Sequence, residues 1–358
     1  MRLRRDSWSE RLVETAARVG TTQPSFEIAA ETLSHLARVG ISESTVWRHH
    51  QEVTEGLKAE LEREEQEIPI WVRLKDVEAM GWIEARDPVE QHASVSIDGL
   101  TVLIRDDGYR EVKMVSVSEV VEAVALEGDG VEVPSQERVD SDEEGQERGR
   151  QDGIKLERHS YRAILGDKET FAPALKVELV RRRVQEVDKI TTVNDGAEWI
   201  WDLVQRYLPS RRQDVLDWAH VLQNLAKAGN AAFGEGSEEA QSWLTQQETN
   251  LWNGQRMKVN NALHHLPRRY KERGKAIRQV KGYIDQHWAR LRYDQFRAEG
   301  RPIGSGTVES AAKNVVAWRM KRGGQRWSRP GAERMLVALG EVHSKRWGTQ
   351  GMGLTQAA

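Results

Sequence analysis

Residues 94–117 read SVSIDGLTVLIRDDGYREVKMVSV, and the apolar pattern of this stretch decides the fold class. Apolar and polar residues alternate in three short runs, which are separated by Asp98-Gly99 and by Asp107-Gly108. A period of two residues is typical of strands that bury one face, and Asp-Gly pairs are common in turns. The stretch therefore predicts a three-stranded meander in which Asp98 stands at the end of the first strand.

Downstream, the chain alternates between strand and helix patterns. A short β-branched run at residues 190–193 ends at Asn194-Asp195-Gly196, and a helical pattern at 197–207 follows it and is closed by Pro209. The other expected segments are a helix at 173–185, a strand at 214–217, helices from 221 to 298 broken at 229–236, Gly254, Pro267 and Gly274, and a last helix at 307–320. Together with the meander, this order predicts a mixed sheet in an α/β fold.

In residues 8–66 the apolar residues recur at the spacing of a helix instead. Within ARVGISEST, residues 37–45, Gly40 suits a tight turn and Ser42 suits the cap of a second helix at 43–52. The combination of a turn residue and a cap residue between two helices predicts a helix-turn-helix, and an ordinary helical hairpin is the alternative. The residues expected to meet DNA are Ser44, Thr45 and Arg48, whereas Val46 and Trp47 are expected to pack inward. A separate charged helix is expected at 52–67, ending before Pro69.

Composition excludes several classes of protein. The chain has 358 residues, no cysteine and no run of eighteen apolar residues. A membrane-spanning protein, a disulfide framework and a thiol nucleophile are therefore all excluded. The basic first residues are not followed by the apolar segment of a secretory signal, so we expect a cytoplasmic protein.

The near-neutral net charge of −3 conceals a strong asymmetry along the chain. Residues 119–147 hold 11 acidic residues and one basic residue, whereas residues 256–346 hold 22 Lys and Arg against 7 Asp and Glu. The second segment carries a surplus of 15 positive charges, which attracts polyanions. Nucleic acid is therefore the expected partner, and a solvated basic helix bundle is the alternative.

Three carboxylates stand where a sheet fold would bring them together. Asp98 and Asp195 are expected at strand ends, each followed by a glycine, and Glu309 is expected in the first turn of a late helix. Convergent carboxylates can hold two Mg²⁺ ions on either side of a scissile phosphate. The alternative is that the Asp-Gly pairs are simply turns.

Three longer blocks resemble the DDE transposases of bacterial insertion sequences, in the Kra-type branch related to the Mutator-like enzymes. They are SVSIDGLTVLIRDDGYREVK, TVNDGAEWIWDLVQRYLP followed by VLDWAHVLQNL, and GSGTVESAAKNVVAWRMKRGGQRWS. The resemblance covers most of residues 90–340. It implies an RNase H-like fold and the cleavage and joining of DNA at the ends of a mobile element. It also implies two Mg²⁺ ions, for which Mn²⁺ can substitute, held by the catalytic residues Asp98, Asp195 and Glu309.

The resemblance also assigns residues around that centre. Asp217 and His220, from the block's Asp-x-x-His motif, are expected to contact DNA beside the active site, and the alternative for His220 is a structural hydrogen bond. Basic residues close to Glu309 in sequence, with Trp318 and Trp327, suit phosphates and stacking. The alternative is that the basic residues form a solvated surface and the two tryptophans belong to the core. These expected DNA contacts are Lys313, Arg319, Lys321, Arg322 and Arg326.

The intervals between the acids, 97 and 114 residues, require insertions into a compact catalytic fold. The first interval contains an acidic excursion, and the second has the helical pattern of an insertion. The expected organisation is a helix-turn-helix region at 1–68, a connector at 69–89, a first catalytic part at 90–220 with the excursion at 124–157, an all-helical insertion at 221–300, a second catalytic part at 301–346 and a tail at 347–358.

The leading hypothesis is therefore a transposase that binds the ends of its element as a homo-oligomer assembled on DNA. A DNA-binding regulator or retired transposase is the second, and a structure-selective nuclease of the same fold is the third. All three acids are present, which favours the first. Paired inverted repeats in the DNA flanking the gene would separate it from the others.

Overall fold

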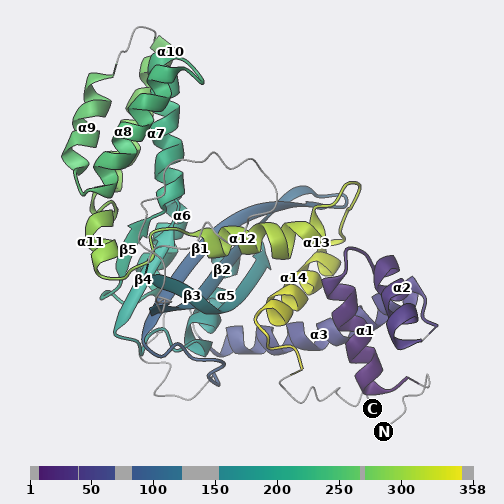
Figure 1. Ribbon diagram of the computed structural model, residues 1–358. Helices are drawn as coiled ribbons and strands as arrows, with labels where there is room; N and C mark the ends of the chain where they lie inside the picture. The colour runs from purple at the N-terminus through teal and green to yellow at the C-terminus, as the bar shows by residue number, and fades with distance from the viewer. Residues whose placement is uncertain (1–7, 39, 69–82, 123–152, 267–270, 349–358) are drawn as a thin grey trace, which may run out of the picture.

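The computed structural model describes residues 8–38, 40–68, 83–122, 153–266 and 271–348, and its centre is a five-stranded mixed sheet (Figure 1). The strand order is β3-β2-β1-β4-β5. The first three strands are antiparallel neighbours, whereas β4 runs parallel to both β1 and β5. The strands span His92–Ile104 (β1), Gly108–Glu122 (β2), Ile154–Leu165 (β3), Lys189–Asn194 (β4) and Gln213–Leu216 (β5).

The meander exists, but its strands differ from the prediction. Asp98-Gly99 is not a turn, because β1 continues through it, with Asp98 opposite Met114 and Gly99 opposite Lys113 of β2. The unbroken antiparallel ladder keeps the backbone extended, so Asp98 lies in the middle of a 13-residue strand. The third strand of the meander is β3, which begins at Ile154, so the end of the expected excursion at 157 is wrong. Residues 123–152 lie outside the described part of the chain.

The strand-helix alternation after the meander is confirmed. Strands β4 and β5 flank helix α6 (Glu198–Tyr207), close to the expected positions. Helix α5 (Lys168–Arg181) begins earlier than predicted, because Asp167 caps it by accepting a hydrogen bond from the Thr170 amide at 2.9 Å. Pro173 therefore lies inside this helix, where it removes one backbone hydrogen bond.

The N-terminal region is helical, as expected, with α1 (Glu10–Thr22), α2 (Phe26–Ala37) and α3 (Glu43–Glu67). The expected boundary near residue 52 is absent, because Val53, Leu57 and Leu61 continue the buried stripe of α3 for 25 residues in all. Val46 is buried as predicted, whereas Trp47 is half exposed, which corrects the prediction for that residue.

A group of helices stands apart from the sheet at the opposite end from α1 and α2 (Figure 1). Its expected breaks at Gly229 and Gly274 are wrong, because these residues lie inside α7 and α10; Gly229 leaves room for Trp243 of α8. The breaks at 234–236 and Gly254 are confirmed by glycines with positive φ. Pro267 lies outside the described residues. The elements are α7 (Trp218–Phe233), α8 (Glu238–Trp252), α9 (Arg256–His265), α10 (Lys271–Gln286), η1 (Trp288–Arg290) and α11 (Tyr293–Ala298).

The chain then returns to the sheet as one helical run. It comprises α12 (Gly306–Ala311), a π-helical turn η2 (Ala312–Ala317) and α13 (Trp318–Met320). This run matches the helix predicted at 307–320, but it is not the last one, because α14 (Arg329–His343) follows. Side chains of α12, η2, α13 and α14 share one buried cluster with β1, β2 and β3, whereas α5 and α6 belong to the other main cluster. Within the described residues, no helix has the length and apolar character to cross a membrane.

Candidate active site

Asp98 within β1 and Asp195, which directly follows β4, lie at the same level of two neighbouring strands. The parallel ladder between β1 and β4 includes the pair Val95 and Thr192. Two residues further on, the Ile97 amide donates to the side-chain oxygen of Asn194 at 2.6 Å. Asp98 and Asp195 are the next residue on each strand. In the sheet, β2 and β3 lie on one side of β1, and β4 and β5 lie on the other. Open α/β sheets bind ligands at such a point, where the order of the strands reverses.

Asp217 caps helix α7 and is almost fully buried. One carboxylate oxygen accepts hydrogen bonds from the His220 amide at 2.8 Å and from His220 Nδ1 at 3.0 Å, and the other accepts from the Ser305 amide at 2.6 Å. Burial alone would raise the pKa of Asp217, but these bonds lower it. Both oxygens are engaged inside the protein, so the predicted contact between Asp217 and DNA is wrong. Asp217 instead ties α7 to the start of α12.

Glu309 is positioned through the same link. Ser305 precedes α12 and donates its hydroxyl to Glu309 Oε1 at 2.7 Å, while its amide is held by Asp217. His220 Nδ1 lies 3.7 Å from the same Glu309 oxygen. The two late blocks of the sequence therefore meet at one point, although 88 residues separate Asp217 from Ser305.

The three predicted acids share one hydrogen-bonding pattern. Asp98 Oδ1 accepts from the Gly99 amide at 2.7 Å, Asp195 Oδ1 from the Ala197 amide at 2.8 Å, and Glu309 Oε1 from Ser305. Among the described residues, no hydrogen bond reaches the second oxygen of any of the three, and no lysine or arginine pairs with them. Each acid is thus oriented by its own local backbone or hydroxyl and keeps one oxygen for a ligand.

The charges of these groups affect one another's pKa values. Burial raises the pKa of Asp98, and the charges of Asp195 and Glu309 raise it further, although the Gly99 amide and His220 oppose them. The pKa of His220 is raised by its bond to Asp217 and by the charges of Glu309 and Asp195. The structure therefore brings Asp98, Asp195, Glu309 and His220 into one electrostatic cluster with an excess of negative charge.

Among the described residues, one group of side chains has the spacing of a metal site. Ligand atoms of Asp217, His220 and Glu309 lie within 4.8 Å of one another, but the Asp217 oxygens are already occupied by donors. The oxygens with no hydrogen bond belong to Asp98, Asp195 and Glu309, and carboxylate oxygens are the ligands that Mg²⁺ prefers. The group with the spacing of a metal site thus includes Glu309 but neither Asp98 nor Asp195, and metal binding by all three predicted acids stays a prediction.

The helical insertion also reaches the site. A Cβ atom on Gly196 would lie 2.0 Å from Cε2 of Tyr283, so the ring of α10 packs directly on the backbone beside Asp195. Tyr283 in turn contacts His287, with ring centroids 4.9 Å apart. Sequence reasoning missed Asn194, Ser305 and Tyr283. The first two stand within the quoted motifs, but no sequence pattern identifies Tyr283.

The predicted DNA contacts divide into exposed and buried residues. Arg319 is 1 % exposed and donates to the carbonyl oxygens of Gly20 and Pro24, so its prediction as a phosphate contact is wrong. Burial against α1 and α2 gives it a structural role. The residues that are exposed are Ser44, Arg48, Lys313, Lys321, Arg322 and Arg326. Thr45 is half-buried, and its hydroxyl contacts that of Ser42 at 2.9 Å.

Comparison with models of known protein families finds no match to this chain, and comparison with curated protein sequences finds none either.

Proposed function

We propose that the protein is a transposase of the DDE type, a divalent-metal-dependent enzyme that cuts and joins DNA strands. The observation that carries the proposal is the shared pattern of Asp98, Asp195 and Glu309, each with one oxygen fixed and one free. Such a set suits two Mg²⁺ ions, and no covalent nucleophile is needed for phosphodiester cleavage.

The chemistry divides between the ions and the side chains. When bound, the ions activate the attacking water or 3′-hydroxyl and stabilise the leaving oxygen. The carboxylates of Asp98, Asp195 and Glu309 hold them, and Asp217 fixes the distance between α7 and α12 through Ser305. His220 is one-third exposed, and its Nε2 has no hydrogen bond within the described residues. Because Nδ1 donates to Asp217, Nε2 donates to a phosphate oxygen when the ring is protonated, the form that the raised pKa of His220 favours.

The fold proposal is an RNase H-like sheet. Three features support it: an antiparallel meander comes first, two parallel strands follow on the other side of β1, and the acids stand beside the reversal of strand order. The helical elements α7–α11 then interrupt the sheet domain before the helix that carries Glu309. This arrangement accounts for the long interval between the second and third acids.

The proposed DNA-binding surface has two parts. Exposed Ser44 and Arg48 lie in the first turns of α3, which suits a helix that enters the major groove. Lys321, Arg322 and Arg326 are exposed just beyond the glutamate helix. Helix α3 packs on α14, which follows the second part, and Lys58 pairs with Glu333 of α14 at 2.8 Å.

The test is cleavage of duplex DNA taken from the regions that flank the gene, with Mg²⁺ or Mn²⁺. Asp98→Asn, Asp195→Asn and Glu309→Gln should each abolish cleavage and leave binding in EDTA unchanged. The matched control is Glu198→Gln, because Glu198 is an exposed acid on α6 close to Asp195 in sequence. Near wild-type cleavage by one of the three variants would remove that residue from the site.

The same assay distinguishes the other hypotheses. Sequence-specific binding without cleavage by the wild type would indicate a regulator or a retired transposase. Cleavage of branched DNA without preference for the flanking sequences would indicate a structure-selective nuclease. Arg48→Ala should reduce the preference for specific over random DNA by about 1 to 3 kcal/mol if Arg48 contacts a base.

A further inference from the structure

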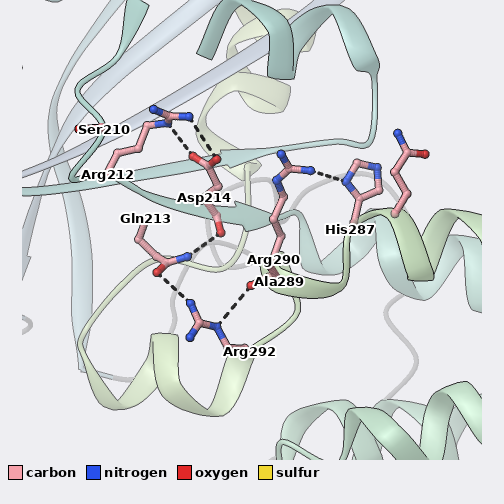
Figure 2. Close-up of a pocket in the computed structure, with 9 residues that line it drawn as sticks. Ser210, Arg212, Gln213, Asp214, His287, Ala289, Arg290 and Arg292 are labelled. Atoms are coloured by element: carbon pink, nitrogen blue, oxygen red, sulfur yellow. Dashed lines mark hydrogen bonds and ion pairs between the residues drawn. The ribbon is translucent and has the colours of Figure 1, made fainter. Parts of the chain in front are cut away.

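A pocket of about 330 Å³ lies at the edge strand β5. Its walls are the chain before and within β5 and the segment that returns from α10 through η1. It opens beside the amino end of β5, whereas Asp217 follows the carboxyl end of that strand. Figure 2 shows three arginines around it: Arg212 joined to Asp214, Arg290 to His287, and Arg292 to Gln213.

The pocket contains more positive than negative charge. Arg212 is neutralised by Asp214, with Nε 2.9 Å from Oδ1. Neither Arg290 nor Arg292 has a carboxylate partner among the described residues. Asp214 is the single acidic residue in the lining, so the three arginines leave a surplus of two positive charges.

Arg290 and Arg292 are held in place by neutral groups instead. Arg290 donates to His287 Nδ1 at 2.8 Å and stacks on the Trp201 ring, with its guanidinium carbon 3.8 Å from the centroid. His287 must be neutral to accept this bond, and burial with the charge of Arg290 lowers its pKa to about 4. Arg292 donates to Gln213 Oε1 and to the Ala289 carbonyl, both at 3.3 Å.

These contacts orient two guanidiniums without neutralising them. Burial lowers the pKa of Arg290, and repulsion from Arg212 adds to this effect, although the charge of Asp214 opposes it; the pKa of Arg206 beside Asp202 is instead raised. A bound anion would remove this repulsion, and guanidinium groups match the geometry of phosphate oxygens. The Ser210 hydroxyl is in the lining, and no described residue hydrogen-bonds to it, so it is a further donor.

We infer that this pocket is a phosphate-binding site formed by Arg290, Arg292 and Ser210. The phosphate can belong to a nucleic-acid backbone or to a free phosphorylated compound, since both present the same oxygens. The volume is at the lower end of the range for small-molecule pockets, which limits the second source to a compact ligand. The inference is independent of the three acids and of metal-dependent cleavage.

The first experiment uses full-length protein with inorganic phosphate and pyrophosphate as probes. Calorimetric titration and thermal unfolding are compared with sodium chloride at equal ionic strength. We expect affinity to fall about tenfold or more for Arg290→Gln/Arg292→Gln, because hydrogen bonds to charged groups are strong. Arg292→Gln alone should show part of the loss and serves as the readout if the double variant unfolds. Arg206→Gln, which removes an arginine outside the pocket, should respond like the wild type.

The second experiment identifies the source of the phosphate. The affinity for duplex DNA is measured across a salt series for the same variants. If a backbone phosphate occupies the pocket, the slope of log affinity against log salt flattens by up to about two for the double variant. Loss of the response to free phosphate with an unchanged DNA slope assigns the site to a free phosphorylated compound. Unchanged phosphate binding together with an unchanged DNA slope would overturn the inference.

Discussion

The side-chain oxygen of Asn194 accepts a hydrogen bond from the Ile97 amide at 2.6 Å, one residue before Asp98. The backbone oxygen of Asn194 accepts from the Asp217 amide at 2.8 Å. Asn194 is fully buried at the end of β4, so its side chain continues the ladder after the main-chain pairing stops. One residue therefore holds β1, β4 and the start of α7 at the level of the acids.

Replacing Asn194 with Ala should destabilise the protein by about 1 to 3 kcal/mol, because the buried Ile97 amide loses its acceptor. Urea unfolding measures this change. Asn314→Ala is the matched control, since Asn314 is exposed and donates to Ser310, and its effect should stay within about 0.5 kcal/mol. Equal effects of the two substitutions would show that the Asn194 bond contributes little.

Asp98→Asn should not reduce the stability of the metal-free protein at pH 7. Folding raises the pKa of Asp98 above its ordinary value of about 4, so its ionised form disfavours the folded state. Protonated Asp98 therefore stabilises the folded state. This contribution is complete at pH values below the ordinary pKa and is lost as the pH rises through the raised pKa of the folded protein. The difference in unfolding free energy between Asp98→Asn and the wild type should therefore disappear at about pH 4. Unfolding in EDTA across pH measures it, and a less stable variant at pH 7 contradicts the expectation.

Gly196→Ala should cost about 1 to 3 kcal/mol, because the new methyl group overlaps the Tyr283 ring. In a Tyr283→Ala background the same substitution should cost much less, since the overlapping ring is gone. The control is Gly282→Ala on α10, the helix that carries Tyr283, because a Cβ at this position meets nothing within 4 Å. This substitution should stabilise the helix by up to about 1 kcal/mol, since alanine favours helix over glycine. An unchanged cost in the double variant would mean that Tyr283 is not the cause.

Substitution of Arg319 should reduce the stability of the protein, whereas substitution of its exposed neighbours should affect DNA binding instead. Arg319→Ala should lower stability by about 2 to 3 kcal/mol, because its charged hydrogen bonds to the Gly20 and Pro24 carbonyls are lost. Its guanidinium also lies over the Phe26 ring, 4.9 Å from the centroid. Urea unfolding tests this expectation, and an unchanged midpoint would contradict the structural role.

The combined substitution of Lys321, Arg322 and Arg326 by Ala should change stability little, because all three side chains are exposed. If they hold DNA, the salt dependence of binding should flatten by up to about three units on every sequence. A salt series on flanking and random duplexes measures the slope. An unchanged slope would assign the three residues to a solvated surface.

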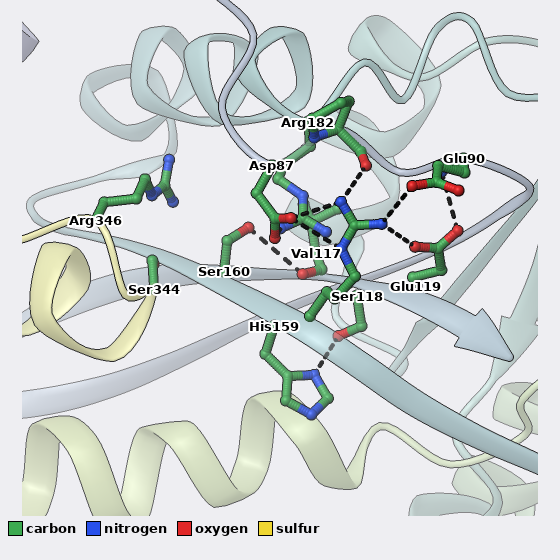
Figure 3. A network of polar contacts seen from close by, with 12 residues as sticks. Asp87, Glu90, Val117, Ser118, Glu119, His159, Ser160, Arg182, Ser344 and Arg346 are labelled. Carbon is green, nitrogen blue, oxygen red and sulfur yellow. Dashed lines mark hydrogen bonds and ion pairs between the residues drawn. The ribbon is translucent and has the colours of Figure 1, made fainter. Parts of the chain in front are cut away.

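Glu178 should make the fold sensitive to acid. Ser160 and Arg346 both contact its carboxylate, Ser160 at 2.5 Å and Arg346 at 2.9 Å. Figure 3 shows these two residues, with Ser160 also joined to the backbone oxygen of Val117. Burial alone would raise the pKa of Glu178, but Arg346, Arg181 and Ser160 lower it to about 2. The stability from this carboxylate is therefore present above its ordinary pKa of about 4.3 and is lost as the pH falls toward about 2.

Glu178→Gln should consequently destabilise the protein by about 3 to 5 kcal/mol at pH 7, because the buried Arg346 loses both hydrogen bonds to the Glu178 carboxylate. The difference from the wild type should shrink between about pH 4 and pH 2. Chemical unfolding at several pH values checks both statements. A difference that stays constant with pH would show that the carboxylate charge does not cause the effect.

Much of the local structure was predictable because it depends on short-range patterns. The strand before Asp195, the helix at 198–207 and the helical run that carries Glu309 follow from the spacing of apolar residues. Asp98 and Asp195 could be selected from sequence because each is followed by a glycine, and Glu309 because its block resembles that of a known family. The position of Asp98 could not, because pairing with β2 along the whole of β1 kept a turn-like Asp-Gly pair extended.

The sequence by itself determined which segments form helices and strands, since helix capping and apolar periodicity act within a few residues. Only the tertiary structure decided which polar groups are available for chemistry. Asp217 uses both oxygens on residues from two elements, and Arg319 is buried by helices about 300 positions away in the chain. Hydrogen-bond saturation and burial depend on partners distant in sequence, and no local pattern specifies those partners.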